Sequence, residues 1–528
     1  MARRSLTATT AALTTIGRVA ATLTPPTTPP KSDGAPHASL SARRRLAPDM
    51  PSDRAMSWLW TALITGVALV LRLINLRSPA KVIFDEVYYS KDAHDLLRHA
   101  VELNGKENGP GFVAHPPFGK WCIAMGEWLF GYNSLGWRVP AVIAGAISVL
   151  LIIRIARRMF RSTLLGCVAG LLLTLDGLHF VMSRVALLDV FLMLFVLVAF
   201  GFLVLDRDAR RADLLRQLES GADLRRGTPG RRWATVAWWR LAAGVAVGLA
   251  LGVKWSAMWF IPAFVLLAFV WEVQARRTAG VRRPIYDTIG REVGWLFAFI
   301  GLLLATYLLT WTGWFVTSTG WDRHWAETTG HEVWWAPDAL VNLWHYQKAV
   351  YEFHTHLTQK HDYQSTPWSW FVLGRPVAFY YSPDGNCGAS KCSAEILALG
   401  NPLLWWSFVP ALVACVWRWL ARRDWTAGAI LLCAAAGIVP WMFYPDRTMF
   451  FFYTLPALPF LVLAVTLVLG MVLGPATAAR DRRVTGAVAL GAYVLVVALA
   501  FAYFYPIYTG EVMTYAKWHA RMWFDSWI

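Results

Sequence analysis

Long hydrophobic runs separated by shorter polar stretches are the dominant pattern of this chain from about residue 57 onward. Each run has the length and apolarity of a helix that crosses a lipid bilayer. The pattern therefore predicts an all-α polytopic membrane protein with about eleven transmembrane helices. The predicted spans are residues 57–76, 137–154, 163–180, 186–205, 238–253, 255–273, 293–312, 402–420, 425–443, 450–473 and 485–505.

The connections between these runs alternate in charge. The basic segments fall at every second connection: the N-terminal tail and residues 154–161, 206–240, 273–292, 418–423 and 480–483. Because Lys and Arg concentrate in cytoplasmic loops, this alternation predicts a cytoplasmic N-terminus and, after an odd number of spans, an external C-terminus. The net charge of +17 then reflects membrane orientation rather than a nucleic-acid partner.

Three segments stand apart from the spans. Residues 1–56 are rich in Thr, Ala, Pro and Arg, which predicts a disordered cytoplasmic tail. A signal peptide is the alternative, but its hydrophobic region would be weak and Arg18 interrupts it. Residues 57–528 form the transmembrane domain, in which the loops 77–136 and 313–401 are predicted to be external. Only 16% of the chain is charged, which is low for a soluble domain.

The second external loop contains the stretch "NCGASKC", in which Cys387 and Cys392 are close enough to pair. An oxidising compartment permits a disulfide there, and two free thiols are the alternative. Aromatic stretches of the same loop, "VWWAPDALVNLWHYQKAVYEF" and "TPWSWFVLGRPVAFYY", are interpreted as an amphipathic interfacial helix and a loop on the membrane.

Ionisable side chains next to the spans gather on the predicted external face. Charges at such positions are energetically costly, so their placement indicates a function. They are Arg72, Asp85, Glu86, Asp176, Arg184, Asp189, Lys254 and Arg447. Cations and carboxylates in an external cavity beside lipid suit a lipid-linked anionic substrate. Purely structural roles remain as alternatives. Arg184 and Asp189 could form an ion pair, Lys254 could only extend its ammonium to the membrane interface, and Arg72 could stabilise the fold.

Five motifs, in this order, resemble the protein O-mannosyltransferases. They are "FDEVYYSKDA", "HPPFGK" (His115–Lys120), "WRVPA" (Trp137–Ala141), "SRVALLD" (Ser183–Asp189) and "GVKWSAMW" (Gly252–Trp259). The resemblance covers residues 57–528. Because loop 313–401 is too short for the β-trefoil domain of eukaryotic members, the chain is most similar to the bacterial, actinobacterial type.

This resemblance implies a glycosyltransferase-C fold and mannose transfer on the external face of the plasma membrane. It implies a polyprenyl-phosphate-mannose donor and Ser or Thr acceptors in secreted proteins, with no cofactor. Asp85 is expected to be the general base, with Glu86 as its support or its alternative. Lys254, Arg447 and Arg184 are expected to bind the phosphate. His115, Lys120, Arg138 and Asp189 are expected to support the site, with Arg138 as a partner for the acidic pair.

Three other interpretations compete with this one. A zinc cluster of His354, His356, His361 and Asp362 is disfavoured, because the spacing matches no closed structural site, and no metal site is predicted. A related enzyme that glycosylates a lipid or polysaccharide would share the same site. A transporter would favour inverted repeats and interrupted helices at mid-membrane depth, and the sequence suggests neither.

Overall fold

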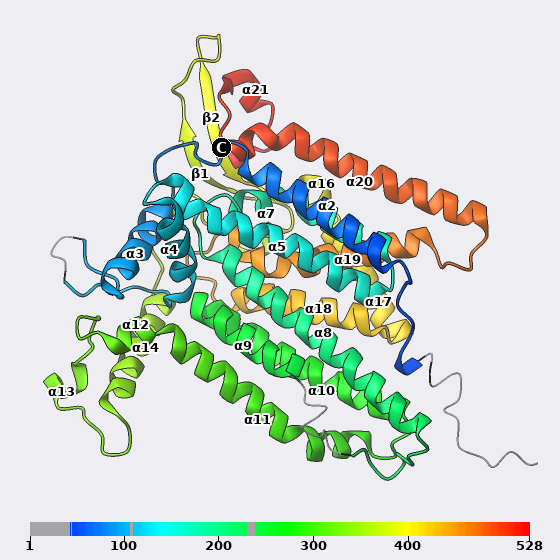
Figure 1. The fold of residues 1–528 in the computed structure, drawn as a ribbon. Coiled ribbons are helices and arrows are strands. Elements are labelled where there is room, and N and C mark those ends of the chain that lie inside the picture. Colours follow the sequence, from blue (N-terminus) through cyan, green and yellow to red (C-terminus); the bar gives the residue numbers. More distant parts are fainter. Residues whose placement is uncertain (1–42, 44, 106–108, 230–237) are drawn as a thin grey trace, which may run out of the picture.

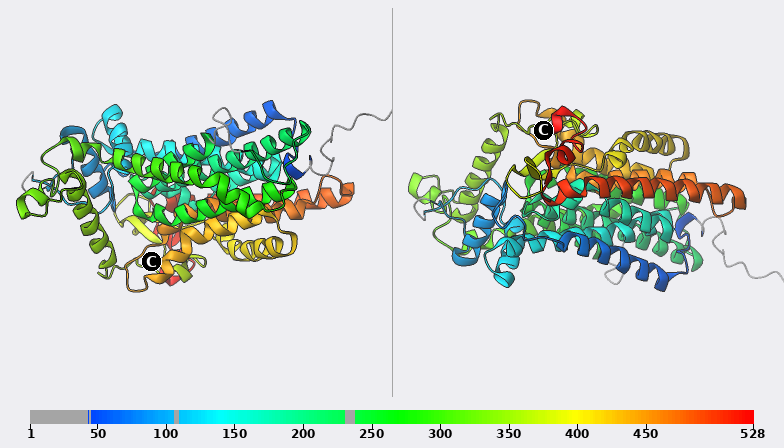
Figure 2. Two further views of the ribbon diagram at one scale, coloured as in Figure 1. Left: turned by 90° about the horizontal axis from the view of Figure 1, so that it is seen from below. Right: turned by 90° about the horizontal axis from the view of Figure 1, so that it is seen from above.

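The computed structural model describes residue 43 and residues 45–105, 109–229 and 238–528. Its long helices lie side by side along one direction, and shorter helices and a small sheet gather at one end (Figure 1). The two views of Figure 2 show the same elongated bundle from below and from above. Most of the predicted N-terminal tail, residues 1–42 and 44, lies outside the described residues.

Nine helical segments of the described ranges are long and apolar enough to cross a membrane. Their main helices are α2 (Arg54–Leu73), α5 (Ser134–Phe160), α8 (Asp189–Glu219), α10 (Phe260–Thr278), α11 (Pro284–Thr310), α17 (Phe408–Arg422), α18 (Trp425–Ile438), α19 (Leu458–Leu473) and α20 (Arg480–Thr509). Four of these are extended by the short helices η2 (Trp255–Trp259), α16 (Pro402–Trp406), η3 (Val439–Phe443) and η4 (Phe451–Ala457). The mostly helical membrane fold is thereby confirmed.

Two shorter apolar helices, α6 (Thr163–Thr174) and α9 (Trp238–Val253), coincide with the two remaining predicted spans. Whether they cross the membrane is not decided by their length, so the count of eleven stays a prediction. Burial separates inner from outer helices. The apolar windows of α5 and α8 are 72% buried and that of η4–α19 is 78% buried, against 28% for α2, α11, α16–α17 and α20. The second group therefore presents its hydrophobic side chains to lipid.

The third predicted span is interrupted near its outer end. α6 ends at Thr174, and Asp176 then caps the short helix α7 (Gly177–Met182) by accepting a hydrogen bond from the His179 amide at 2.8 Å. The other Asp176 oxygen accepts from the Trp405 indole at 2.7 Å, while Arg72 Nη2 lies 2.7 Å from His179 Nδ1. Asp176 and Arg72 therefore join neighbouring helices.

The loop layer, defined as residues 74–133 and 311–401, covers one end of the bundle. Its helices are α3 (Glu86–His99), α4 (Phe118–Phe130), α12 (Thr312–Val316), α13 (Trp325–Thr329), α14 (Asp338–Thr355) and α15 (Pro367–Trp370). α14 begins within the stretch predicted to be an amphipathic helix and ends two residues beyond it. The other aromatic stretch, predicted to be a loop, contains α15 and most of strand β1 instead.

A small antiparallel sheet of order β1-β2-β3 completes this end. β1 (Val377–Ser382) pairs with β2 (Cys392–Ala398), and β3 (Met513–Thr514) comes from the C-terminal segment that also forms α21 (Tyr515–His519) and η5 (Asp525–Trp527). A disulfide between Cys387 and Cys392 closes the hairpin, which decides between the two alternatives left by the sequence. The Trp518 indole donates to Glu395 at 2.6 Å and ties the C-terminal segment to β2.

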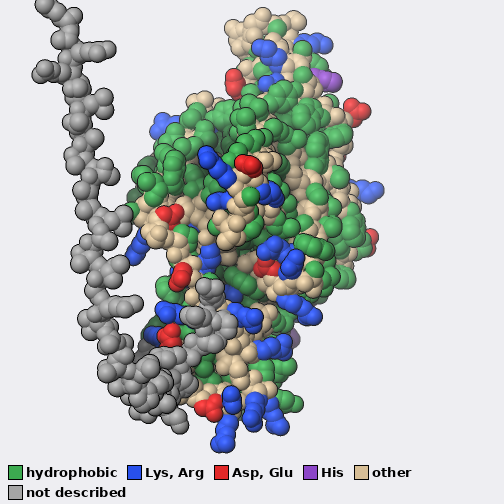
Figure 3. All heavy atoms as spheres, turned by 90° about the vertical axis from the view of Figure 1, so that its right-hand side faces the viewer, with side chains coloured by type: hydrophobic (Ala, Val, Ile, Leu, Met, Phe, Trp, Pro, Cys, Tyr) green, Lys and Arg blue, Asp and Glu red, His purple; other side chains and the backbone are tan. Residues whose placement is uncertain are grey.

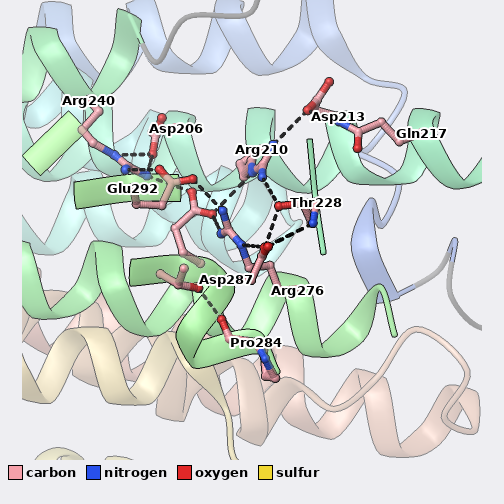
Figure 4. Close-up of polar contacts among 12 residues, drawn as sticks. Asp206, Arg210, Asp213, Gln217, Thr228, Arg240, Arg276, Pro284, Asp287 and Glu292 are labelled. Atoms are coloured by element: carbon pink, nitrogen blue, oxygen red, sulfur yellow. Dashed lines mark hydrogen bonds and ion pairs between the residues drawn. The ribbon is translucent and has the colours of Figure 1, made fainter. Parts of the chain in front are cut away.

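A buried ionic network joins α8, α9, α10 and α11 on the side of the bundle away from the loop layer (Figure 4). Arg240 of α9 donates to Asp206 of α8 at 2.7 Å, to Glu272 of α10 at 2.8 Å and to Glu292 of α11 at 2.8 Å. Arg276 of α10 adds bonds to Asp287 and Glu292 of α11. Each guanidinium meets more than one carboxylate, so desolvation of these charges is offset by several charge-assisted bonds.

Candidate active site

The acidic pair lies at the point where the chain leaves the loop after α2 and enters α3. Phe84 has a φ of 47°, a left-handed conformation that is strained for a bulky residue. Its ring is held by stacking on Phe379 of β1, with centroids 4.7 Å apart. Asp85 is the N-cap of α3 and Glu86 is its first residue. The two adjacent carboxylates therefore start from one tight turn and enter different surroundings.

Glu86 is completely buried and its carboxylate is fully engaged. Arg138 of α5 donates Nε to Oε1 and Nη2 to Oε2, both at 2.8 Å. The amides of Ile83 and Ala186 donate to the same carboxylate at 3.0 Å each. A bidentate Arg–carboxylate pair is among the stronger hydrogen-bonded arrangements in proteins, and two further amide donors add to it here. Glu86 thus joins α3, α5 and the α7–α8 connection, and it has no lone pair to spare for a substrate.

Asp85 is only partly buried, and its carboxylate forms no hydrogen bond with any residue that the structure describes. It does not use its side chain to cap α3. Burial raises the pKa of Asp85 to about 6; the nearby Lys254 ammonium opposes this rise and the Asp189 carboxylate adds to it. Asp85 is therefore an available carboxylate whose pKa lies close to neutrality, as a general base requires.

Lys254 and Asp189 form the polar floor of a pocket next to Asp85. The pocket holds about 740 Å³ of empty space, its open mouth included. Lys254 Nζ donates to both Asp189 oxygens, at 2.9 and 3.0 Å, and it lies 5.1 Å from the ring centre of Tyr453. The carboxylate orients the ammonium, and both groups are almost fully buried. The ion pair that the sequence left open between Arg184 and Asp189 is therefore wrong.

Arg447 lines the same pocket together with two histidines. Its Nε donates to the His354 carbonyl at 3.1 Å, and Nη2 approaches His354 Nδ1 at 3.4 Å. His354 Nε2 donates to the Ala114 carbonyl at 2.8 Å, and its ring stacks on that of His115 with centroids 5.0 Å apart. Burial lowers the pKa of His354 to about 4 and that of His115 well below its usual value, so both rings are neutral.

Most of the remaining pocket wall is aromatic. It comprises Trp255, Trp259, Tyr351, Trp441, Tyr444 and Tyr453. Arg447 lies 5.4 Å from the ring centres of both Trp441 and Tyr453, which fixes its guanidinium plane. The arrangement combines two fixed cations, an apolar rim and a nearby carboxylate. Such a pocket can bind an anion carried by a hydrophobic chain and can accept a proton beside it.

Besides Asp85 and Glu86, three other residues expected at the site do not line this pocket. Arg184 donates to the carbonyls of Arg72 at 2.6 Å and Ile74 at 2.7 Å, at the end of α2, so the structure does not bring it to the other cations. Lys120 is buried between Glu102 and Asp92 within the first loop. Arg138 meets Glu86 and no other carboxylate among the described residues. These three side chains hold the loop layer in place.

His354, Tyr453 and Trp441 line the pocket but were not predicted as site residues. The sequence carried a partial signal, because "EFHTH" combines histidines with aromatic residues and "YPDRTMFFFY" surrounds Arg447. Neither stretch reveals that α14 of the loop layer packs over the connection before η4. That proximity depends on contacts such as the one between Arg447 and the carbonyl of His354 in α14.

Comparison with solved structures identifies the class of protein to which this fold belongs. The S. cerevisiae protein O-mannosyltransferase Pmt1-Pmt2 complex bound to the sugar donor has a chain that matches with a TM-score of 0.69 and 14% identity, over 93% of this chain and 95% of that one. ArnT from Cupriavidus metallidurans bound to undecaprenyl phosphate matches with a TM-score of 0.50 and 17% identity, over 84% of this chain and 70% of that one. The protein has the fold of the glycosyltransferase-C membrane enzymes.

Sequence comparison then gives the family. Polyprenol-phosphate-mannose–protein mannosyltransferases from Mycolicibacterium smegmatis and Mycobacterium tuberculosis are both 40% identical over 90% of this chain, covering 94% and 93% of their own lengths. The Corynebacterium glutamicum relative is 34% identical over 90% of this chain and 94% of its own. Family models for dolichyl-phosphate-mannose-protein mannosyltransferase and for the C-terminal four-helix region of protein O-mannosyltransferase match residues 114–216 and 339–527. The chain belongs to the protein O-mannosyltransferase family, and the resemblance inferred from its motifs is confirmed.

Proposed function

We propose that this protein transfers mannose from a polyprenyl-phosphate-mannose donor to Ser or Thr hydroxyls of secreted polypeptides. The names of its relatives, polyprenol-phosphate-mannose–protein mannosyltransferases, support the donor and a protein acceptor. The observation that carries the assignment to this chain is the separation of the acidic pair. The Glu86 carboxylate accepts hydrogen bonds from Arg138 and from two amides. Asp85 remains available beside a pocket that contains Lys254 and Arg447.

The donor phosphate binds between Lys254 and Arg447 in this proposal. Two fixed cations that line one pocket can neutralise the phosphate as it becomes the leaving group, which lowers the barrier without a metal ion. Asp189 and His354 hold these cations in position. The aromatic rim beside α10 receives the first part of the hydrophobic chain, while the remainder extends into lipid.

Asp85 acts on the acceptor in the same proposal. The acceptor hydroxyl oxygen forms a bond to the anomeric carbon of mannose while the bond from that carbon to the phosphate oxygen breaks. The hydroxyl proton moves to Asp85, and the electron pair of the broken bond stays on the phosphate. Positive charge that develops on the sugar ring faces the Asp85 carboxylate. Glu86 and Arg138 are positioning residues that hold the start of α3.

The reaction takes place at the external face of the plasma membrane in this assignment. The alternation of basic connections supports it, since the loop layer and the acidic pair lie on the side opposite to the basic segments 154–161, 273–292 and 480–483. The loop layer also contains the Cys387–Cys392 disulfide, which is typical of an oxidising compartment.

The test uses purified full-length protein, a radiolabelled polyprenyl-phosphate mannose and a peptide rich in Thr and Pro. Label should appear on the peptide and should be absent from a matched peptide in which every Thr is replaced by Val. Transfer of label to a glycolipid or polysaccharide acceptor, with none to the Thr peptide, would assign this chain to the alternative acceptor class.

A further inference from the structure

A second recess lies at the end of the bundle opposite the acidic pocket. It holds about 1,850 Å³ of empty space, including its open mouth. Three connections form it: the turn after α5, the turn between α17 and α18, and the segment that follows α19. Each of these three connections lies at the end of the bundle opposite the loop layer and the acidic pocket. Figure 3 views the molecule from this end and shows Lys and Arg side chains among exposed hydrophobic ones.

Arginines from different segments surround this basic recess. They are Arg161, Arg418, Arg422 and Arg483, and the carboxylate that lines the recess with them is that of Asp424. Four guanidiniums around one carboxylate leave the recess strongly positive.

The existing ion pairs do not neutralise this charge. Arg418 Nε donates to Asp424 at 2.5 Å, but the other Asp424 oxygen already accepts from the Thr426 amide and hydroxyl. Arg161 pairs with Asp208, a carboxylate that Arg158 and Arg207 share. The structure gives the exposed side chains of Arg422 and Arg483 no hydrogen bond or ion pair with any described residue. These two are therefore free to bind an anion.

The recess opens where the helices meet the membrane surface. Trp417 and Trp425 line it, and tryptophan is enriched at the depth of lipid headgroups. The outward face of α17 next to it is apolar, with Val413 and Leu420 exposed to 65% and 62%. Since α17 is one of the spanning helices, acyl chains contact that face. An anion that enters the recess at this depth can therefore belong to a membrane lipid.

We propose that this basic recess binds the phosphate group of an anionic phospholipid. Arginine binds phosphate through two parallel N–H donors, and basic pockets between helices at a membrane surface are suited to phosphate headgroups. Arg422 and Arg483 approach the phosphate from α17 and α20, and the acyl chains lie along the exposed face of α17. The lipid thereby joins two outer helices. This site is separate from mannose transfer and does not depend on the proposed function.

The test titrates full-length protein in phosphatidylcholine nanodiscs with a fluorescent phosphatidylglycerol. The variant Arg422→Gln/Arg483→Gln should bind this probe at least about 10-fold more weakly, because two charged donors are lost. The matched control is Arg277→Gln/Arg282→Gln, which removes the same charge from exposed positions at the same end of the bundle. The control should bind within about twofold of the unmodified protein, and an unchanged melting temperature of both variants shows that they are folded.

Two outcomes would overturn the proposal. Equal weakening in both variants would mean that the probe responds to general surface charge, and no weakening in Arg422→Gln/Arg483→Gln would mean that the recess does not bind phosphate. A parallel titration with glycerol 3-phosphate distinguishes a lipid from a soluble anion. If the soluble phosphate displaces the probe at equal concentration, the lipid assignment is wrong.

Discussion

At the scale of single residues, Asp85 and Glu86 show how neighbours of the same chemistry acquire different roles. Glu86 receives two bonds from Arg138 and two from amides. Asp85 is left beside Lys254 and Asp189 with an elevated pKa of about 6. A carboxylate with every lone pair occupied stabilises structure, whereas a partly exposed one without hydrogen bonds can take a proton.

Substitution of Asp85 should therefore affect turnover, whereas substitution of Glu86 should affect stability. Asp85→Asn should reduce turnover by roughly two to four orders of magnitude, the usual contribution of a general base, and leave the melting temperature unchanged. Glu86→Gln should destabilise the protein by about 3 kcal/mol, because Arg138 keeps its buried charge without a counterion. Turnover per folded molecule and thermal unfolding in detergent separate the two effects. An active, fully folded Asp85→Asn variant would contradict the assignment of the base.

The pH dependence of transfer should report Asp85. A base must be deprotonated to accept the hydroxyl proton, so kcat/KM should rise with pH up to about 6 and level off above it. The measurement is a profile of kcat/KM between mildly acidic and mildly alkaline pH with saturating donor. Asp85→Asn should remove this acid limb from its residual activity. A limb that persists unchanged in the variant belongs to another group.

Lys254 should affect the donor more than the acceptor. Lys254→Gln should raise the KM for polyprenyl-phosphate mannose by roughly 10- to 100-fold, the range expected for a hydrogen bond to a charged group, with little change in the KM for peptide. The control Lys254→Gln/Asp189→Asn removes both members of the ion pair. This double variant should regain the stability lost in Lys254→Gln, but it should not regain the affinity for the donor. An unchanged donor KM would leave Lys254 with a purely structural role.

At the scale of elements, two layers of ionic contacts define the ends of the helices. On the catalytic side, Glu86 joins α3 to α5, and Arg184 joins the α7–α8 connection to the end of α2. Lys120 joins α4 to Glu102 within the loop layer. On the other side, Arg240 and Arg276 join α8, α9, α10 and α11 (Figure 4). The described residues of the second network do not line the pocket of Lys254 and Arg447, so we expect this network to act on stability.

Removal of one cation from that second network should destabilise the bundle without altering catalysis. Arg240→Met removes the guanidinium that joins Asp206 to Glu272 and Glu292, and loss of one partner from a buried pair costs about 3–5 kcal/mol. Thermal unfolding should show the loss, while the donor KM of the folded fraction stays normal. The exposed Arg277→Met is the matched control and should change stability little. A normal melting temperature for Arg240→Met would show that the network is dispensable.

At the scale of the whole molecule, the position of the loop layer determines where transfer occurs. The acidic pair, the pocket and the disulfide all lie at one end of the helix bundle. The arginine-rich turns lie at the other end (Figures 1 and 3). An asymmetric distribution of this kind orients a membrane protein with its basic end in the cytoplasm.

The orientation can be tested with reporters fused after Ile528. The C-terminal segment packs on β2 through Trp518 and Glu395, so it belongs to the same end as the loop layer. An alkaline phosphatase fusion, which is active only outside the cytoplasm, should be active there. A fusion at the turn near Gly280, at the opposite end, should be inactive. The reverse pattern would place the catalytic pocket in the cytoplasm.

Much of this protein could be predicted from its sequence because the responsible signals are local. Spans are visible as apolar runs, since a helix in lipid satisfies its backbone internally, and the family is visible in five short motifs. Asp85, Lys254 and Arg447 could be proposed for the same reason: a charge beside a span is costly and therefore conspicuous. The small sheet was missed because the aromatic stretch that contains most of β1 was interpreted as a loop, and because β3 pairs with β2 from the distant C-terminal segment.

Only the tertiary structure distinguished the roles of residues that look alike in sequence. Asp85 and Glu86 are adjacent and chemically similar, and their difference arises from Arg138 and the Ala186 amide, which packing of α5 and the α7–α8 connection places against one of them. Likewise, Asp189 pairs with Lys254, while the nearby Arg184 binds carbonyls at the end of α2. Charged side chains pair with whatever the fold brings within a few ångströms, because buried charges need partners regardless of their separation along the chain.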